Sequence, residues 1–257
     1  MDGAVRLDGR TAIVTGAGQG VGLGIASAFA AQGANVVVAA RRAETGEPAA
    51  QGIRDRGGDA TCIVTDVTSR DDVARCVEQT VERYRGLEIM VHNAFRGGVG
   101  HRLEDADLAV WDDNSRTAAW GSFYCAQLAS PHLERAGRRG RLILITSPAG
   151  MEGSANIPVY SPVKGAQRAM AKSLSREWGP RGVTVNCIAP VAETPALAGA
   201  FETIAGLRER VEGRTSLRRI GDPELDIGGV AVFLASDEGG YVTGQTIVCD
   251  GGSFMGL

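Results

Sequence analysis

Seven short apolar runs alternate with helical segments along this chain, and this alternation constrains the fold more than any other feature. Strands that are apolar throughout and separated by helices are buried on both faces, so they pair in parallel through right-handed crossovers. The sequence therefore predicts an α/β fold with a doubly wound, seven-stranded parallel sheet and helices on both faces. The runs are TAIVTG (11–16), NVVVAA (35–40), TCIVTD (61–66), LEIMVHN (87–93), RLILITS (141–147), VTVNCIA (183–189) and QTIVCDG (245–251).

The helical segments lie between these runs. At 257 residues the chain suits one domain, residues 1–257, and it shows no repeat or linker. Ligands of such a sheet bind beyond the carboxyl ends of the strands, so we expect functional residues in the segments that follow them. Helical periodicity is clear at 20–32, 70–84, 160–178 and 224–236, and weaker at 44–56, 105–134 and 196–212.

Charge and composition exclude several classes of protein. The net charge is −3 and the 27 Lys and Arg residues are scattered, so we expect no nucleic-acid partner. The amino-terminal MDGAVRLDGR lacks the apolar segment of a signal peptide, and no run approaches the roughly 18 apolar residues of a membrane span, so we expect a cytoplasmic protein without a membrane partner. The five cysteines form no C-x-x-C pair, which favours reduced thiols, and the three histidines lack metal-ligand spacing, so no metal site is expected.

The stretch TGAGQGVG (15–22) joins the first predicted strand to the first predicted helix. Glycines at 16, 20 and 22 allow a tight turn, close approach of a pyrophosphate and packing of the helix on the sheet, and the helix start offers free N–H groups to an anion. A glycine-rich turn without a ligand is the alternative. The position of the loop in a long alternating chain favours a bound dinucleotide.

The end of the second strand indicates which dinucleotide is bound. An acidic side chain there would accept hydrogen bonds from the adenosine ribose of NAD. Here Ala40 is followed by Arg41 and Arg42, so no carboxylate repels a 2′-phosphate and Arg41 can bind one. NADP(H) is therefore preferred, and NAD(H) stays possible if both arginines are solvated surface residues. Asp66, closing the third strand, is placed to meet the adenine or to cap the next helix.

With the glycine loop, the alternation and YSPVK (160–164), the sequence resembles the short-chain dehydrogenase/reductase superfamily, in its shorter single-domain branch, over essentially the whole chain. The other matching stretches are HNA (92–94), Ser147 in LITSPAG, VNCIAP (185–190) and FLASDEGGYVTGQTIVCDGG (233–252). The resemblance implies a Rossmann-type core, a nicotinamide cofactor, hydride transfer between an alcohol and a ketone, and a homo-oligomer, a tetramer or a dimer. The predicted cofactor-binding residues are Gly16, Gln19, Gly20, Val21, Gly22, Arg41, Arg42, Asp66, Val67, Asn93, Ala94, Tyr160, Lys164, Pro190, Val191 and Thr194.

The predicted catalytic residues are Ser147, Tyr160 and Lys164. Tyr160 and Lys164 are four residues apart, so on a helix they share a face. An ammonium about 5 Å away favours the phenolate by about 3 kcal/mol, roughly two pKa units, which suits general acid–base work. We expect Tyr160 to exchange a proton with the substrate oxygen. The resemblance adds that Ser147 bonds that oxygen, Lys164 holds the nicotinamide ribose and Asn93 supports the cofactor side.

The sequence departs from the family pattern in three respects. Ala118 in WDDNSRTAAWG stands where the family has an asparagine that anchors a proton-relay water, and Asn114, one turn earlier, could contribute instead. Phe95 after HNA and Val191 after IAP replace glycines, so we expect a narrower pocket. The loop PVAETPA (190–196) is one residue shorter than usual, and Thr194 remains the candidate for bonding the carboxamide.

These observations predict an NADP(H)-dependent carbonyl reductase or secondary-alcohol dehydrogenase for a small to medium, apolar ketone or alcohol. Two segments, a lid at 192–215 and residues 94–104, are expected to set the substrate. One alternative is a nucleotide-binding sensor or subunit that has lost catalysis, which Ala118 and the two replaced glycines motivate. Another is imine or enoyl reduction on the same fold.

Overall fold

The computed structural model describes residues 6–96, 102–155 and 157–254, and in this part all seven predicted strands form one sheet. Every neighbouring pair is parallel, in the order β3-β2-β1-β4-β5-β6-β7, so the predicted doubly wound Rossmann-type sheet is confirmed. The strand order reverses between β1 and β4, which is where such sheets bind ligands. The strands are β1 Thr11–Thr15, β2 Asn35–Ala40, β3 Asp59–Val64, β4 Ile89–His92, β5 Arg141–Ile145, β6 Thr184–Pro190 and β7 Thr246–Cys249.

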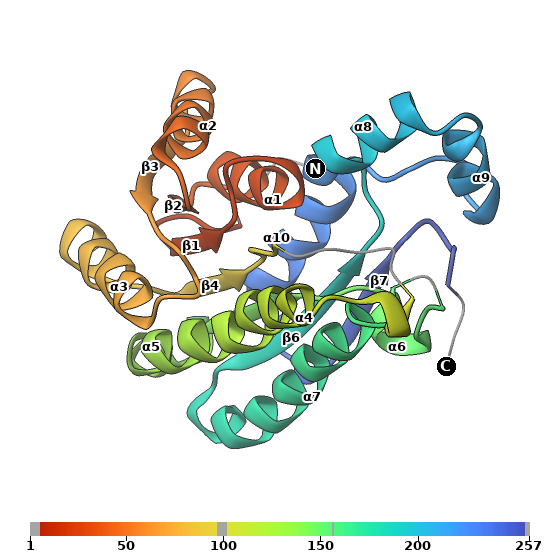
Figure 1. Ribbon diagram of the computed structural model, residues 1–257. Coiled ribbons are helices and arrows are strands. Elements are labelled where there is room, and N and C mark those ends of the chain that lie inside the picture. The colour runs from red at the N-terminus through yellow and green to blue at the C-terminus, as the bar shows by residue number, and fades with distance from the viewer. Residues whose placement is uncertain (1–5, 97–101, 156, 255–257) are drawn as a thin grey trace.

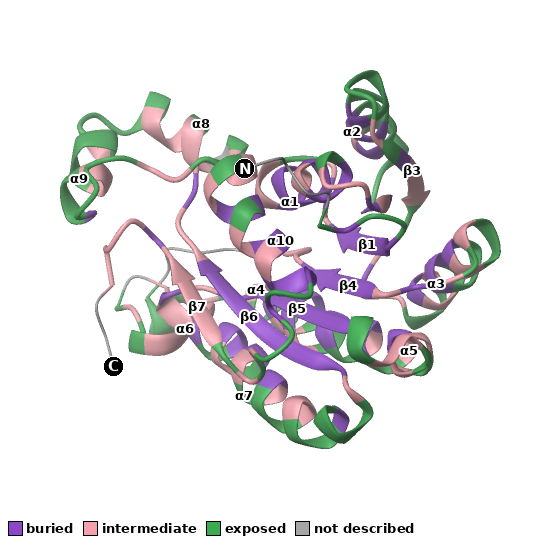
Figure 2. Cartoon of the chain, turned by 180° about the vertical axis from the view of Figure 1, so that it is seen from behind, coloured by how far each residue is buried: buried purple, intermediate pink, exposed green. Residues whose placement is uncertain are grey.

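Helices cover both faces of the sheet (Figure 1). Alternate strand residues point to opposite faces, so Val14 joins the core under one helical layer and its neighbour Ile13 joins the other. The inner strands β1, β2, β4, β5 and β6 are accordingly buried, the edge strands β3 and β7 are partly buried, and the helices carry exposed residues on their outer sides (Figure 2). The first layer contains α1 Gly20–Ala31, α2 Ala43–Asp55 and α10 Gly229–Ala235, and the second contains α3 Arg70–Tyr84, α5 Gly121–Ala136 and α7 Ser161–Trp178.

Of the three weaker helix predictions, 44–56 is confirmed by α2 and the other two needed correction. The segment predicted at 105–134 begins with a 3-10 turn, Leu103–Asp105, followed by α4 Leu108–Asn114, which runs through a π-helical stretch, Ser115–Trp120, into α5. The single helix predicted at 196–212 is wrong. It is two helices, α8 Pro195–Thr203 and α9 Leu207–Arg214, because the backbone at Gly206 turns to φ 67°. A short helix, α6 Ala149–Glu152, was not predicted.

The helix before β7 begins with a capped turn. The side chain of Asp222 accepts hydrogen bonds from the N–H groups of Glu224 and Leu225, and Pro223 occupies the first turn. This start is a π-helical stretch, Pro223–Gly228, that continues into α10. Further 3-10 turns lie at Gly137–Arg139 and Gly179–Arg181.

Two buried arginines tie the amino ends of the strands to the end of α10. Arg10 donates to the carbonyl of Ala235 at 2.7 Å, and Arg141 donates to that of Ser236 at 2.9 Å. Burial and the nearby Arg10 charge lower the pKa of Arg141 to about 10. The carbonyl groups at the end of α10 therefore receive charged donors.

The five cysteines are all free thiols, three of them buried and two partly buried, as the sequence predicts. Within the described residues no cluster of three or more His, Cys, Asp or Glu side chains could hold a metal ion. The same part of the chain contains no helix with the length and apolar character needed to cross a membrane.

Candidate active site

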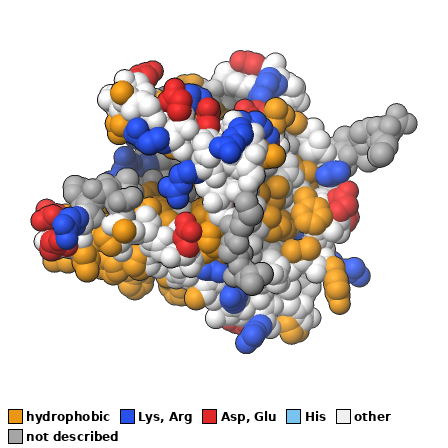
Figure 3. Space-filling model, turned by 90° about the vertical axis from the view of Figure 1, so that its right-hand side faces the viewer, with side chains coloured by type: hydrophobic (Ala, Val, Ile, Leu, Met, Phe, Trp, Pro, Cys, Tyr) orange, Lys and Arg blue, Asp and Glu red, His pale blue; other side chains and the backbone are white. Residues whose placement is uncertain are grey.

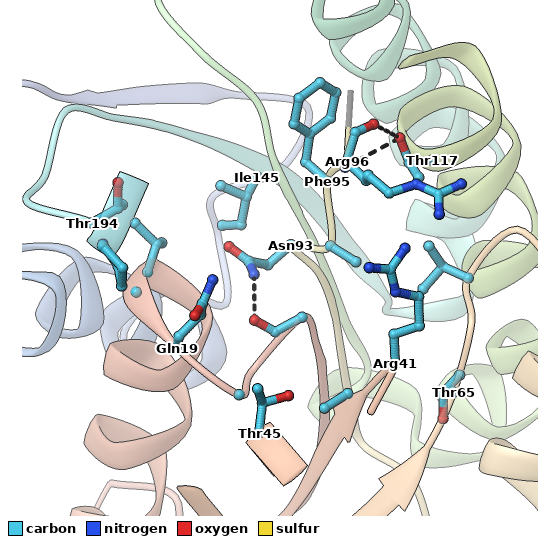
Figure 4. Close-up of a pocket in the computed structure, with 18 of the residues that line it drawn as sticks. Gln19, Arg41, Thr45, Thr65, Asn93, Phe95, Arg96, Thr117, Ile145 and Thr194 are labelled. Carbon is cyan, nitrogen blue, oxygen red and sulfur yellow. Dashed lines mark hydrogen bonds between the residues drawn. The ribbon is translucent and has the colours of Figure 1, made fainter. Parts of the chain in front are cut away.

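A cleft of about 530 Å³ lies at the carboxyl ends of the strands, where β1 and β4 diverge (Figure 4). Its walls come from the glycine loop, the segments after β2, β3, β4, β5 and β6, and the start of α7. Fourteen of the predicted site residues line it: Gly16, Gln19, Gly20, Val21, Arg41, Arg42, Asp66, Val67, Asn93, Ala94, Tyr160, Lys164, Pro190 and Thr194. The sheet therefore brings together residues that are far apart in sequence.

The glycine loop has no room for side chains at two of its positions. A β carbon on Gly22 would lie 2.5 Å from both Asn93 Nδ2 and the Gly16 carbonyl oxygen, and one on Gly16 would lie 2.8 Å from Ala94 Cα. Gly16 and Gly20 also have φ of 66° and 56°, where glycine is favoured. Gln19, the N-cap residue of α1, makes no capping hydrogen bond with its side chain, and the first turn of α1 holds no acidic residue. The loop and the helix start therefore fit the diphosphate of a dinucleotide.

A hydrogen-bond network joins the glycine loop to the end of β4. Asn93 Nδ2 donates to the carbonyls of Thr15 and Gly16 at 3.0 and 3.2 Å, and Figure 4 shows Asn93 at the centre of the cleft. The Thr15 hydroxyl accepts from the N–H groups of Asn93 and Ala94 at 3.0 and 3.1 Å. Asn93 thus holds two walls of the cleft together.

The far end of the cleft carries the two arginines that follow β2. Arg41 and Arg42 are both exposed, and Arg41 lies across the cleft from Thr194 (Figure 4). Asp66 accepts from the N–H and hydroxyl of Thr68 at 2.9 and 2.7 Å. The helix after it is capped instead by Ser69, so the alternative of Asp66 as a helix cap is wrong.

Tyr160 and Lys164 line the other end of the cleft, and Ser147 contacts Tyr160 without lining the cleft itself. Lys164 lies one turn into α7, its N–H donates to the Tyr160 carbonyl at 3.2 Å, and its side chain is buried. Its Nζ donates to the carbonyl of Ile145 at 2.8 Å and lies 5.7 Å from the centre of the Tyr160 ring. Ser147 is hydrogen-bonded to Tyr160. The predicted trio is thus assembled in one place.

The protein's own groups do not lower the pKa of Tyr160 as predicted. Burial raises the pKa of Tyr160, and the hydrogen bond with Ser147 opposes that effect only in part. Burial also lowers the pKa of Lys164 to about 7. The expectation assumed a fully charged ammonium in a dielectric of about 20, whereas burial disfavours both charged forms.

Ala118 occupies the position at which the family has an asparagine, and its side chain packs in the protein interior. Ala118 is fully buried in the π-helical stretch. Beside it, the Thr117 hydroxyl donates to the carbonyls of Asp113 and Arg96 at 2.6 and 2.7 Å, and the Thr117 carbonyl lies 3.1 Å from His92 Nε2. Asn114 is fully buried and is not part of the cleft wall.

Three predicted residues do not line the cleft, namely Gly22, Ser147 and Val191. Gly22 packs behind the loop, Ser147 contacts Tyr160, and Val191 pairs through its backbone with Cys249 and Gly221. Sequence reasoning missed several lining residues. Ala40, Thr65, Ile145 and Thr146 follow or end strands and could have been found from that position, as could Gly18 from the glycine loop. Arg96, Ala192 and Pro195 lie in the segments expected to set the substrate, whereas Thr45 and Thr117 give no distinct signal.

The segments expected to set the substrate flank the cleft. Thr194 caps α8 by accepting from the Leu197 N–H at 3.2 Å. Phe95, predicted to narrow the pocket, lines the cleft and packs edge-to-face against Tyr160 with ring centres 5.0 Å apart. Of the stretch 94–104, residues 97–101 lie outside the described residues.

Comparison with known proteins gives concordant matches. The family described as enoyl-(acyl carrier protein) reductase matches residues 16–253. The 3-oxoacyl-acyl-carrier-protein reductase FabG of Staphylococcus aureus is 33% identical over 249 residues, covering 96% of this chain and 98% of that protein.

Two solved structures are similar along nearly their whole length. A 7α-hydroxysteroid dehydrogenase complexed with NADH and 7-oxo glycochenodeoxycholic acid has a TM-score of 0.91 at 31% identity, covering 99% of this chain and 98% of that one. A gluconate 5-dehydrogenase from Burkholderia cenocepacia J2315, in complex with NADP and tartrate, has a TM-score of 0.90 at 31% identity with the same coverage.

Fold, cleft and matches together define a nicotinamide-dependent oxidoreductase. The chain belongs to the short-chain dehydrogenase/reductase superfamily, in its single-domain branch.

Proposed function

We propose that the protein is an NADP(H)-dependent carbonyl reductase or secondary-alcohol dehydrogenase. The observation that carries the proposal is the placement of Tyr160, hydrogen-bonded to Ser147, and of Lys164 at one end of a cleft whose other walls include the glycine loop and Arg41. It is a single domain, with residues 192–215 as a lid over the substrate.

The preference for NADP(H) rests on charge. Arg41 and Arg42 line the cleft directly after β2, and no carboxylate stands at that strand end to repel a 2′-phosphate. Similar proteins bind either cofactor, since the hydroxysteroid dehydrogenase structure holds NADH and the gluconate dehydrogenase structure holds NADP. In this proposal Arg41 is therefore the residue that favours NADP(H) over NAD(H).

The chemistry divides between cofactor and protein. A bound nicotinamide supplies or accepts the hydride. In reduction Tyr160 Oη donates a proton to the ketone oxygen, and in oxidation it removes that proton. Ser147 orients the same oxygen, and Lys164 holds positive charge beside the ring of Tyr160. Gly16, Gly22 and Asn93 keep the loop close to the diphosphate.

An apolar, uncharged ketone is the proposed substrate. Arg41 and Arg42 are assigned to the cofactor, and two arginines of the segments expected to set the substrate are paired, because Arg96 lies 2.9 Å from Asp113 and Arg208 lies 3.0 Å from Glu193. Figure 3, which views the side that carries α8 and α9, shows acidic and basic side chains interspersed with apolar ones. No charge of one sign on that face calls for an ionic substrate.

Enoyl reduction is the second candidate, because the matching family is described as enoyl-(acyl carrier protein) reductase. Product analysis separates the two reactions, since ketone reduction yields an alcohol and enoyl reduction yields a saturated carbon–carbon bond. A sensor without catalysis would bind NADPH and turn over no substrate.

We further propose a homo-oligomer in the cytoplasm, where the five thiols stay reduced. The α4–α5 segment exposes large apolar side chains, with Trp120 54% and Leu108 78% exposed. It also carries Asp112 and Arg116, which pair with each other at 2.6 Å within one chain, so the apolar side chains are proposed to make the two-fold contact between copies. Light scattering of the wild type and Trp120→Glu tests this, since loss of self-association in the variant is expected.

The experiment for the main proposal pairs binding with turnover. NADPH and NADH are titrated by fluorescence into the wild type and Arg41→Ala, and then a ketone and alcohol panel is assayed. Tighter binding of NADPH than NADH in the wild type, reduced in Arg41→Ala, supports the proposal. Equal affinities in the wild type contradict the role of Arg41, and clean NADPH binding without turnover favours the sensor.

A further inference from the structure

Phe95 brings an aromatic ring into the catalytic end of the cleft at a position where the family carries glycine. Its ring is perpendicular to that of Tyr160, at an interplanar angle of 82° and 5.0 Å between centres. Lys164 Nζ lies over the Phe95 ring, 5.0 Å from its centre, closer than the 5.7 Å to the Tyr160 ring. One ring therefore contacts both members of the pair.

Lys164 has few polar partners to stabilise its charge. An ammonium has three N–H donors, and among the described residues the one carbonyl that Nζ reaches is that of Ile145. The titratable groups around it are His92 on β4, Cys187 on β6 and Tyr160, which immediately precedes α7. Burial lowers the pKa of His92 to about 3 and raises that of Cys187 to about 12, so neither carries a charge at neutral pH.

An aromatic face attracts a cation because its quadrupole places negative charge above the ring, and the attraction grows when both groups are withdrawn from water. Lys164 is 3% exposed and Phe95 is partly buried. With no anion facing the ammonium from the described residues, the rings supply much of the negative potential that it meets.

We propose that Phe95 is a positioning residue whose ring stabilises the charged form of Lys164 and fixes the ring of Tyr160 beside it. This inference rests on the proposed function only for its catalytic consequence. A substitution that keeps apolar volume but removes the ring should lower the pKa of Lys164 by about one unit, a tenfold change in the ratio of ammonium to amine. A residue that merely fills space would leave that ratio unchanged.

The chain offers a clean measurement because it contains two lysines, Lys164 and Lys172. Protein labelled with carbon-13 at lysine Cε gives two signals by NMR, and the exposed Lys172 is the internal control. Both signals are titrated with pH in the wild type, Phe95→Leu and Phe95→Tyr, with Lys164→Arg assigning the buried signal. Phe95→Met replaces Phe95→Leu if the latter is not folded by thermal unfolding.

We expect the Lys164 midpoint to fall by about one pH unit in Phe95→Leu and to move by less than about 0.3 unit in Phe95→Tyr, which keeps the ring. A midpoint in Phe95→Leu within 0.3 unit of the wild type overturns the inference. In active enzyme, the pH profile of kcat/KM should shift in parallel. If the midpoint shifts but no substrate is turned over, the proposed function fails and the positioning of Lys164 stands.

Discussion

Replacing Lys164 by Met should stabilise the protein at neutral pH while abolishing catalysis. Burial lowers the pKa of Lys164 from 10.5 to about 7. At 1.36 kcal/mol per pH unit, this difference corresponds to roughly 5 kcal/mol between the two protonation states. The active site therefore holds a charge at a cost to folding, and an apolar side chain of similar length removes that cost.

The pKa values of Lys164 in the folded and unfolded chains determine whether stability rises or falls with pH. The folded chain has the lower pKa, so between pH 7 and 10.5 the unfolded chain binds more protons at Lys164 and stability rises with pH. Below that window Lys164 is protonated in both states and the full cost is present. The stability advantage of Lys164→Met is therefore largest at pH 7 and below, and it shrinks by about 3 kcal/mol by pH 10.

The loss of one hydrogen bond opposes the stabilisation expected for Lys164→Met. The variant leaves the Ile145 carbonyl without its donor at 2.8 Å, which costs about 1–3 kcal/mol if no water replaces it. That loss is independent of pH. It therefore lowers the stability advantage of Lys164→Met at every pH without changing how the advantage varies with pH. The slope is the quantity to test.

The assay is urea unfolding of wild type and Lys164→Met at pH 6.5, 7.5, 8.5 and 9.5 and at one protein concentration, because self-association would otherwise alter the apparent stability. Lys172→Met, at an exposed position of the same helix, is the control and should track the wild type within about 0.5 kcal/mol. A difference between Lys164→Met and wild type that stays constant within about 0.5 kcal/mol across this range would refute the reasoning.

Three further predictions concern the glycine loop, the amino ends of the strands and the network around Asn93. Gly22→Ala places a methyl group 2.5 Å from the amide of Asn93, so it should lower the free energy of unfolding by about 1–3 kcal/mol and weaken NADPH binding. Thermal unfolding and fluorescence titration measure the two effects. Gly52→Ala is the control and should not lower stability, because the space around Gly52 is open. Arg141→Met removes buried donors from carbonyl groups and should lower the free energy of unfolding in urea by about 1–3 kcal/mol. Thr15→Val removes the acceptor of two backbone N–H groups and should lower both stability and NADPH affinity, and unchanged values would show that this network does not hold the cleft.

The sheet could be predicted from sequence because its signal is local. Strands buried on both faces are apolar throughout, so each of the seven runs was recognisable alone, and helices between them imposed the parallel order. The division of 196–212 into two helices was not predictable in this way. It depends on the left-handed backbone at Gly206, which the helical pattern on either side conceals.

The site was predictable where residues have a fixed spacing, as in the glycine loop and the pair Tyr160 and Lys164. Their electrostatics were not, because the pKa of each depends on burial and on neighbours that folding supplies. The carbonyl of Ile145 and the ring of Phe95 approach Lys164 from β5 and from the segment after β4. No pattern in the sequence indicates that these groups meet.

Turnover by Tyr160→Phe tests most directly whether the phenol is the proton donor of this site. NADPH binding is measured by fluorescence and NADPH oxidation with an active ketone is followed at saturating cofactor. We expect a dissociation constant within about threefold of the wild type and a fall in kcat of at least about 100-fold, the usual contribution of general acid catalysis. A variant that binds NADPH normally and reduces the ketone at nearly the wild-type rate would contradict the account.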